Sequence, residues 1–331
     1  MVHLTGKRVL VTGAGGFIGS HLVQALLPVA GKVTAMLHYD ARADWGNLEF
    51  LSAEEQDAIE VVAADVTDAH AMRSLIRGQD IVFHLAALIG IPYSYRAPAA
   101  YFETNVLGAI HVLEACRDAG VERLIGTSTS ECYGTALRVP IDEDHPLQAQ
   151  SPYAASKIAS DKAMESYACS FEMPVVIVRP FNTYGPRQSA RAILPTIITQ
   201  VLSEAPVIKL GSLEPTRDLT YAADTASGFI AAAQAQGVEG ELFNLGVGHA
   251  VSIGELLELV FEISGIRKPV ETDAQRVRPP RSEVMELLSD NRKAKERLGW
   301  QPQVDLREGI AQTVDFIRQH MDHYKNRRYA I

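Results

Sequence analysis

The sequence predicts an α/β fold in which a doubly wound parallel sheet is followed by a smaller, discontinuous α/β unit. Short apolar runs bounded by glycine or turn residues alternate with helical patterns over residues 1–178. Such alternation is typical of parallel strands that are buried on both faces and joined by crossover helices. Beyond Arg179 the alternation stops, and prolines separate shorter apolar segments. This change indicates that a second structural unit begins there.

The elements of the large sheet follow in chain order. We expect strands over Lys7–Thr12, Val33–Leu37, Ile59–Ala63, Ile81–Leu85, Arg123–Thr127 and Val175–Arg179. We expect helices over Gly16–Leu27, Ala69–Arg77, Ala99–Ala119 and Tyr153–Ser170. Later in the chain, Leu219–Ala223 and Leu242–Leu245 are expected to return to the sheet, and Ser252–Ser264 and Asn291–Leu298 to form small amphipathic helices.

Composition narrows the class of protein. The 331 residues carry a net charge of −9, and 47% are hydrophobic, so the chain can bury a large core without disulfide or metal crosslinks. A net acidic chain repels phosphate backbones, which argues against nucleic acid and anionic membranes as partners. Three cysteines without CxxC spacing indicate a reduced, cytoplasmic protein without a metal site. No apolar run has the length of a membrane span or a secretory signal.

A glycine-rich turn joins the first strand to the first helix. Gly13, Gly16 and Gly19 have the spacing GxxGxxG, with Phe17 and Ile18 between the last two. Without Cβ atoms the backbone can turn tightly and approach a pyrophosphate, whose charge is favoured by the N–H groups of a helix N-terminus. Its place between a strand and a helix predicts a Rossmann-type dinucleotide-binding domain.

Residues for the adenosine half of a dinucleotide are expected after the second and third strands. The position where an acidic residue usually binds the ribose falls near His38, which is not acidic. Asp40 lies close enough to reach the ribose, whereas Arg42 would suit a 2′-phosphate, so NAD and NADP both stay open. Asp65 and Val66 are expected to contact adenine, or else to belong to an ordinary helix start.

Tyr153 and Lys157 form a YxxxK pair. Positions four apart lie on one face of a helix, so the phenol and the ammonium can share a site. The ammonium is expected to lower the pKa of Tyr153 and make it a base near neutral pH. Ser151 and Pro152 are typical of the N-cap and first turn of that helix. The pair therefore indicates proton transfer beside a dinucleotide.

Seven motifs occur in the order GAGGFIG (13–19), HLAA (84–87), NVLG (105–108), STSECYG (128–134), SPYAASK (151–157), RPFNTYGPR (179–187) and RDLTY (217–221). With these motifs, nearly the whole chain resembles the extended short-chain dehydrogenases/reductases that act as NAD(P)-dependent nucleotide-sugar epimerases and dehydratases. The resemblance implies a tightly held NAD or NADP that is recycled within each turnover. It also implies a dinucleotide-binding domain (1–178 and 219–247) and a nucleotide-sugar-binding domain (179–218 and 248–331).

The expected cofactor contacts combine the residues above with further motif positions. They are Gly13, Gly16, Phe17, Ile18, Gly19, His38, Asp40, Arg42, Asp65, Val66, Leu85, Ala86, Ala87, Asn105, Thr127, Tyr153, Lys157 and Pro180.

Residues 129–131 decide which reaction the resemblance implies. In the family, the phenol at Tyr153 and the ammonium at Lys157 serve oxidation of sugar C4, and Thr129 would hydrogen-bond the hydroxyl. A 4,6-dehydratase must also remove the C5 proton and expel the C6 hydroxyl, which needs a carboxylate and a proton donor. Glu131, two residues after Thr129 on an expected extended strand end, would face the same side and act as base, with Ser130 assisting. The alternative is that Glu131 is a structural acid of the turn.

The remaining motifs imply a sugar-nucleotide site. Segments at 85–95 and 187–200 resemble N-acetylglucosamine 4,6-dehydratases of legionaminic-acid-type pathways, and residues 129–131 resemble guanosine-diphosphate-mannose 4,6-dehydratases. The expected substrate contacts are Ile89, Glu131, Asn182, Arg187, Leu194, Lys209, Arg217, Arg278 and Arg281. The arginines would bind the diphosphate locally in spite of the acidic net charge; Arg278 and Arg281 are alternatively surface charges.

The sequence thus predicts a 4,6-dehydratase that forms a 4-keto-6-deoxy sugar nucleotide, with an N-acetylhexosamine as the sugar. Three alternatives remain: a 4-epimerase, which would not need Glu131; a uronate decarboxylase, which shares the C4-ketone step; and a non-catalytic nucleotide sensor, which would not need Tyr153 and Lys157. The resemblance further implies a homodimer that pairs helices 99–119 and 153–170. The nucleotide base stays open.

Overall fold

A seven-stranded parallel sheet forms the centre of the larger lobe in the computed structural model, which describes residues 3–273 and 284–324. The sheet order is β10-β6-β5-β4-β1-β2-β3, and every neighbouring pair is parallel. The strands are β1 (Arg8–Thr12), β2 (Lys32–Leu37), β3 (Ile59–Ala63), β4 (Ile81–His84), β5 (Arg123–Thr127), β6 (Val175–Pro180) and β10 (Leu242–Leu245). The predicted doubly wound, Rossmann-like sheet is confirmed. Its order reverses between β1 and β4, where such sheets bind ligands at their carboxyl edge.

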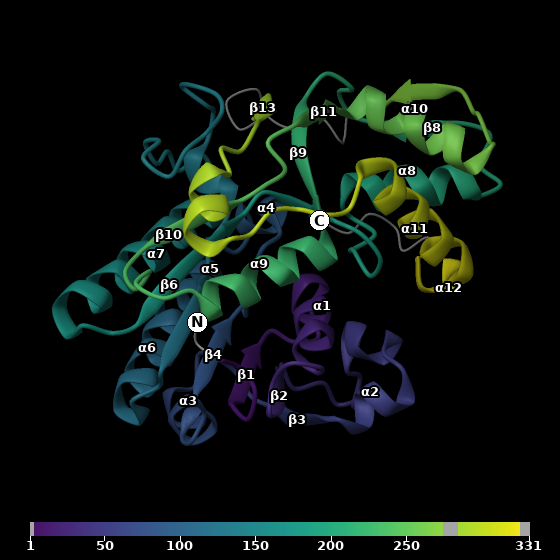
Figure 1. Ribbon diagram of the computed structural model, residues 1–331. Coiled ribbons are helices and arrows are strands. Elements are labelled where there is room, and N and C mark those ends of the chain that lie inside the picture. The colour runs from purple at the N-terminus through teal and green to yellow at the C-terminus, as the bar shows by residue number, and fades with distance from the viewer. Residues whose placement is uncertain (1–2, 274–283, 325–331) are drawn as a thin grey trace.

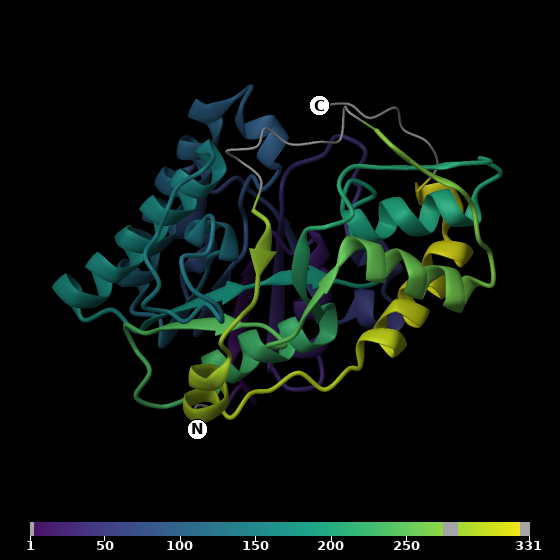
Figure 2. The same ribbon diagram turned by 90° about the horizontal axis from the view of Figure 1, so that it is seen from above.

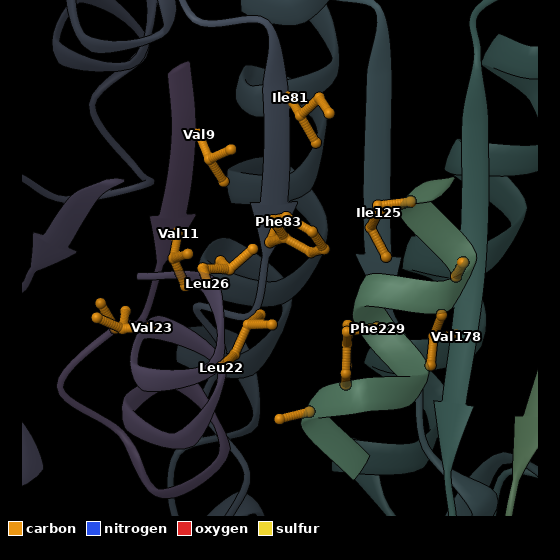
Figure 3. Packing of buried hydrophobic residues seen from close by; sticks show 14 of the residues in the cluster. Val9, Val11, Leu22, Val23, Leu26, Ile81, Phe83, Ile125, Val178 and Phe229 are labelled. Carbon is orange, nitrogen blue, oxygen red and sulfur yellow. The ribbon is translucent and has the colours of Figure 1, made fainter. Parts of the chain in front are cut away.

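Helices cover both faces of this sheet (Figure 1). One face packs against α1 (Phe17–Leu26) and α9 (Ala222–Gln234), and the other against α3 (Ala69–Ile76), α6 (Gly108–Ala119) and α7 (Pro152–Phe171). Figure 3 shows the first core, in which Leu22 and Leu26 of α1 and Phe229 of α9 meet strand residues such as Phe83. Each such side chain contributes about 1.5–3 kcal/mol when it is fully buried, so the two cores fix the strand ends on which the site depends.

The helix expected over 99–119 is not regular. It consists of α5 (Pro98–Phe102), a π-helical turn, η2 (Glu103–Leu107), and α6. Such π turns insert one residue into a helix and are frequent at functional sites. The helix expected at 153–170 is confirmed as α7, and the Ser151 side chain accepts a hydrogen bond from the Ala154 N–H, as predicted for its N-cap.

The smaller lobe is built from short elements that come from separate parts of the chain (Figures 1 and 2). Its strands are β7 (Asn182–Tyr184), β8 (Ile208–Leu210), β9 (Thr216–Tyr221), β11 (Ala250–Ser252), β12 (Val270–Thr272) and β13 (Glu286–Leu287). Its helices are α8 (Ile193–Leu202), α10 (Ile253–Ser264), α11 (Leu306–Gln319) and α12 (Met321–Tyr324), and α8, α10 and α11 enclose a core of their own. The division into two domains at the expected boundaries stays a prediction.

One expected strand is assigned to the wrong sheet. Residues 219–221 do not return to the large sheet; they end β9, which pairs with β7, β11 and β13 in the smaller lobe. Tyr221 is the N-cap of α9, so the chain re-enters the larger lobe as a helix. The expected return of Leu242–Leu245 is confirmed as β10, and the helix expected at 291–298 is the shorter π-helical turn η6 (Ala294–Leu298).

The segment after β2 joins the two lobes. It contains the 3₁₀ turn η1 (Gly46–Phe50) and the short helix α2 (Ala53–Asp57). The Phe50 ring packs edge-on against Phe316, His320 and His323 of the C-terminal helices, at centroid distances of 5.1, 5.0 and 5.1 Å. In residues 3–273 and 284–324, no helix is both long and apolar enough to cross a bilayer.

Candidate active site

The glycine-rich turn between β1 and α1 has no room for side chains. Gly13 has a φ of +69°, and a Cβ there would lie 2.8 Å from the Ala86 nitrogen; a Cβ on Gly19 would lie 2.2 Å from the Gly13 oxygen. The N-cap Gly16 offers no side-chain acceptor, so the first N–H groups of α1, at Phe17 and Ile18, are left for a ligand. These residues fit a dinucleotide pyrophosphate. No group of three potential metal ligands occurs within the described part of the chain.

The end of β4 is fixed beside this turn by Thr12. Its Oγ1 accepts hydrogen bonds from the N–H groups of Leu85 and Ala86, each at 3.1 Å, and lies 3.0 Å from Nδ1 of His84. Because two amides donate to the oxygen, its own proton is directed to Nδ1, and His84 is the neutral Nε2–H tautomer. Burial, with a smaller contribution from the charge of Lys157, lowers the pKa of His84 to about 3. The segment Leu85–Ala87 therefore follows a rigid, uncharged strand end.

The expected adenosine contacts cluster after β2 and β3. His38 Nε2 lies 3.3 Å from an Asp65 carboxylate oxygen, and Arg42 Nη2 lies 3.0 Å from Asp40. Asp65 also accepts a hydrogen bond from the Thr67 N–H at 2.8 Å. The loop after β2 thus holds an acidic and a basic side chain that pair with each other, and the choice between NAD and NADP stays open.

Val66 is buried, unlike the other expected adenosine contacts. It is 3% exposed and packs against α6, where a Cβ on Gly108 would lie 2.7 Å from its Cγ2. Its backbone oxygen pairs with His111 Nδ1 at 3.0 Å.

Tyr153 and Lys157 are buried side by side on α7, at 7% and 4% exposure. Lys157 Nζ donates to the Thr127 carbonyl oxygen at 2.5 Å, so the end of β5 holds the ammonium. Burial raises the pKa of Tyr153, and the hydrogen bond with Thr129 lowers it only in part. The expected lowering of this pKa is therefore outweighed by desolvation. Burial lowers the pKa of Lys157, while the nearby Asp161 carboxylate raises it.

Glu131 reaches this pair by a different backbone route from the one expected. The chain is extended only to Thr129, which caps the 3₁₀ turn η3 (Ser130–Tyr133) and accepts a hydrogen bond from the Glu131 N–H at 3.3 Å. The extended geometry assumed for 129–131 is therefore wrong, because the chain turns at Ser130. The charge of Glu131 still contributes to the raised pKa of Tyr153, after the larger effect of burial. Ser130 is 3% exposed.

A buried ion pair that none of the sequence motifs predicts lies beneath Lys157. Asp161 lies one turn beyond Lys157 on α7, and its Oδ2 accepts from Arg179 Nη2 at 2.6 Å and from the Ser128 hydroxyl at 2.5 Å. Arg179 also stacks on the Tyr133 ring, with its guanidinium carbon 4.5 Å from the ring centroid. The i, i+4, i+8 spacing of residues 153, 157 and 161 was the available sequence signal.

The expected substrate contacts are dispersed. Asn182 begins β7, and its Oδ1 is buried without a hydrogen-bond partner in the described part of the chain, as suits a group that awaits a ligand. Arg217 on β9 is 9% exposed and donates to the Thr216 oxygen at 2.8 Å. Leu194 is 1% exposed in the core of the smaller lobe, and Lys209 lies on β8 with its N–H bonded to Gln200.

Other expected contacts lie at the margins of the site. Arg187, with a φ of +68°, points to α1 and donates to Gln24 Oε1 at 2.6 Å. Ile89 follows β4 and is 68% exposed, and Pro180 ends β6 opposite Leu245. Asn105 lies in η2. Arg278 and Arg281 lie outside the described residues.

A family model described as GDP-mannose 4,6-dehydratase matches residues 10–313. The chain belongs to this family. It is 36% identical over 318 residues to a UDP-glucose 4-epimerase of Mycolicibacterium smegmatis, covering 94% of this chain and 98% of the relative. It is 31% identical over 333 residues to the human dTDP-D-glucose 4,6-dehydratase, covering 98% and 94%.

Solved structures agree with the family. The dTDP-glucose 4,6-dehydratase of Streptomyces venezuelae, solved with NAD and TYD bound, superposes with a TM-score of 0.86 at 30% identity, covering 96% of this chain and 99% of that one. A UDP-N-acetylglucosamine 4-epimerase of Methanobrevibacter ruminantium, in complex with UDP-N-acetylmuramic acid, gives 0.86 at 29% identity, covering 95% and 99%. The chain is therefore an enzyme of the nucleotide-sugar dehydratase and epimerase type.

Proposed function

We propose that this enzyme is an NAD(P)-dependent nucleotide-sugar 4,6-dehydratase that produces a 4-keto-6-deoxy sugar, with an N-acetylhexosamine as the sugar. The observation that carries the proposal is a carboxylate, Glu131, in the turn η3 that Thr129 caps; its charge acts on the Tyr153 phenol, and the Ser130 hydroxyl comes directly before it in the chain. Elimination of water from C5 and C6 needs a carboxylate at this place, whereas C4 epimerisation does not.

The proposed cycle uses this chain's groups for every proton. NAD(P) held at the glycine-rich turn would supply the redox chemistry of the cycle, in which a hydride moves from C4 to C6. Tyr153 Oη takes the proton of the C4 hydroxyl, and Thr129 orients both groups. The C4 ketone acidifies C5–H, Glu131 removes that proton and passes it, directly or through Ser130, to the C6 hydroxyl, which leaves as water. C5 takes up a proton as hydride is returned at C6, and the proton held by Tyr153 balances it, so the net loss is one water. Lys157, anchored at the Thr127 oxygen, stabilises the phenolate through its charge.

Mass spectrometry of products from a panel of nucleotide sugars tests the proposal. We expect the loss of one water from the sugar. An unchanged mass with an inverted C4 centre would contradict it and support a 4-epimerase, the candidate favoured by the 36% identity to a UDP-glucose 4-epimerase. Release of carbon dioxide from a uronate would indicate a decarboxylase. Bound cofactor without turnover on the whole panel would indicate a sensor.

The variant Glu131→Gln separates oxidation of C4 from the elimination of water. We expect this variant to oxidise C4, seen as absorbance of the reduced cofactor, and to lose dehydration by about 10²–10⁴-fold, the usual contribution of a general base. Glu258→Gln is the matched control, because Glu258 pairs with Arg267 on the exposed surface of α10 in the smaller lobe. Full turnover by Glu131→Gln would remove Glu131 from the mechanism.

We also propose a homodimer that buries the outer faces of α5, α6 and α7. Phe102 of α5, Leu107 of the intervening turn η2 and Phe171 of α7 support this assignment, because these large apolar side chains are 43%, 50% and 49% exposed. Light scattering is expected to give twice the mass of the chain, and a monomer at micromolar concentration would contradict it.

A further inference from the structure

Tyr101 connects the proposed catalytic phenol to a neighbouring surface segment. It lies on α5 and is 1% exposed. Its ring packs edge-on against the ring of Tyr153, with centroids 6.2 Å apart and an interplanar angle of 77°. Its hydroxyl donates to the carbonyl oxygen of Gly90 at 2.5 Å. One side chain thus contacts the site through its ring and the segment after β4 through its hydroxyl.

The segment Leu88–Gly90 leads into the short helix α4 (Ile91–Ser94), and the Gly90 oxygen also accepts a hydrogen bond from the Ser94 N–H at 3.0 Å. Asn105, in the π turn η2, accepts from the Leu88 N–H at 2.8 Å and donates to the Leu88 oxygen at 3.0 Å. The same side chain donates to the Ser156 hydroxyl at 2.9 Å, next to Lys157 on α7. Asn105 therefore fixes the start of the segment, and Tyr101 joins its end, already bonded within α4, to the side of the site. Ile89 lies between these two anchors and is 68% exposed.

On the basis of the function proposed above, we propose that Tyr101 is a positioning residue that holds Ile89 in place for the sugar nucleotide and aligns the ring of Tyr153. An exposed apolar residue on a loose segment would lose conformational freedom when substrate binds, and that loss weakens affinity. Two anchors remove most of this freedom before binding. The edge-on contact restricts rotation of the phenol toward the substrate hydroxyl.

The two roles belong to different parts of the side chain and can be separated. Tyr101→Phe removes the hydroxyl and keeps the ring. We expect KM for the nucleotide sugar to rise about three- to tenfold, the usual weight of one hydrogen bond, with kcat within twofold of wild type. Tyr101→Leu removes the ring as well, and we expect kcat to fall about tenfold in addition, because an aromatic pair and its packing are lost.

Tyr167→Phe is the matched control. Its hydroxyl donates to Glu114, so it joins α7 to α6 as Tyr101 joins α5 to the segment after β4, but it does so away from the site. A general loosening of the helices would affect Tyr167→Phe and Tyr101→Phe alike. We expect the control to keep the wild-type KM and kcat.

Hydrogen–deuterium exchange of peptides that cover residues 86–92 tests the anchor without turnover. We expect these amides to exchange about three- to tenfold faster in Tyr101→Phe than in wild type or Tyr167→Phe. Unchanged exchange and unchanged KM in Tyr101→Phe would overturn the proposal, as would an equal loss of kcat in Tyr101→Phe and Tyr101→Leu. An absence of wild-type turnover would refute the proposed function instead, and the exchange rates would still decide the role of Tyr101.

Discussion

Two aspartate–arginine pairs at the carboxyl edge of the sheet have the same chemistry and opposite surroundings. Asp161 and Arg179, beneath Lys157, are 2.6 Å apart, and their side chains are 0% and 2% exposed. Asp40 and Arg42, after β2, are 3.0 Å apart with side chains 34% and 76% exposed. The distances are similar, but only the first pair has lost its water. Breaking a buried pair strands a charge in a medium that cannot solvate it, whereas water replaces the partner of an exposed one.

The regions around the two pairs are stabilised by different means. Below Lys157, the Asp161 carboxylate accepts hydrogen bonds from Arg179 and from the Ser128 hydroxyl, and Arg179 also donates to that hydroxyl, all within the protein interior. After β2, the backbone makes the contacts: the Asn47 N–H donates to the Gly15 oxygen at 2.9 Å, and Gly46 lies against that same oxygen. The free energy of unfolding should therefore be sensitive to substitutions that remove a charge in the first region, and to substitutions that add side-chain atoms in the second.

The largest effect is expected from Asp161→Asn. Arg179 would keep its charge in the interior without a full partner, so the free energy of unfolding should fall by about 3–5 kcal/mol in urea denaturation. Asp161→Asn combined with Arg179→Met should lose less than the sum of the single variants, because the stranded charge is removed. Additive losses would show that the two side chains do not act as a pair.

The free energy of unfolding should fall in acid, because two histidines are buried in their neutral form. The pKa of His84 is lowered to about 3 and that of His21 to about 4, mainly by burial, from an unfolded value of 6.5. The unfolded chain binds more protons below pH 6.5, so stability is full above that pH and falls as pH drops toward 4. The slope is up to about 1.4 kcal/mol per pH unit for each histidine. His84→Gln should flatten this slope in urea midpoints measured against pH, and parallel curves would contradict the assignment.

A smaller effect is expected from Gly46→Ala, which tests shape in the second region. Gly46 has a φ of +63°, and a Cβ there would lie 2.7 Å from the Gly15 oxygen. We expect a loss of about 1–3 kcal/mol and poorer retention of cofactor through gel filtration. Gly120→Ala is the control, because Gly120 has the same φ and no atom within 4 Å of its Cβ position. Equal losses in both variants would show that only backbone strain matters.

The smallest effect is expected from Asp40→Asn. The midpoint of urea unfolding should not change measurably, since the pair with Arg42 is exposed. The ratio of the dissociation constants for NAD and NADP should nevertheless shift toward NADP, because Arg42 loses the nearer of its two carboxylate partners and repulsion of a 2′-phosphate by Asp40 disappears. A changed unfolding midpoint with an unchanged ratio of dissociation constants would show that Asp40 stabilises the fold and does not select the cofactor.

Most of the larger lobe could be predicted from the sequence because buried parallel strands leave unbroken apolar runs. Tyr153 and Lys157 could be paired because helical spacing is local. The sheet that contains residues 219–221 could not be predicted, because the same apolar pattern suits either sheet. The turn at Ser130 depends on the Thr129 cap, and the direction of Arg187 depends on its φ of +68°. Tyr101 contacts Gly90 and Tyr153, which are distant from it in sequence, so no local sequence pattern predicts its role.

The position of β10 has a consequence for biosynthesis. Until Leu242–Leu245 leaves the ribosome, β6 is the edge of the large sheet, with unpaired N–H and C=O groups. About 65 residues separate the ends of β6 and β10, which takes roughly 3–13 seconds at ~5–20 residues per second. During that interval the nascent chain carries an apolar edge open to aggregation. A premature stop between Pro180 and Leu242 makes that state permanent, although the glycine-rich turn, Glu131, Tyr153 and Lys157 would all be present.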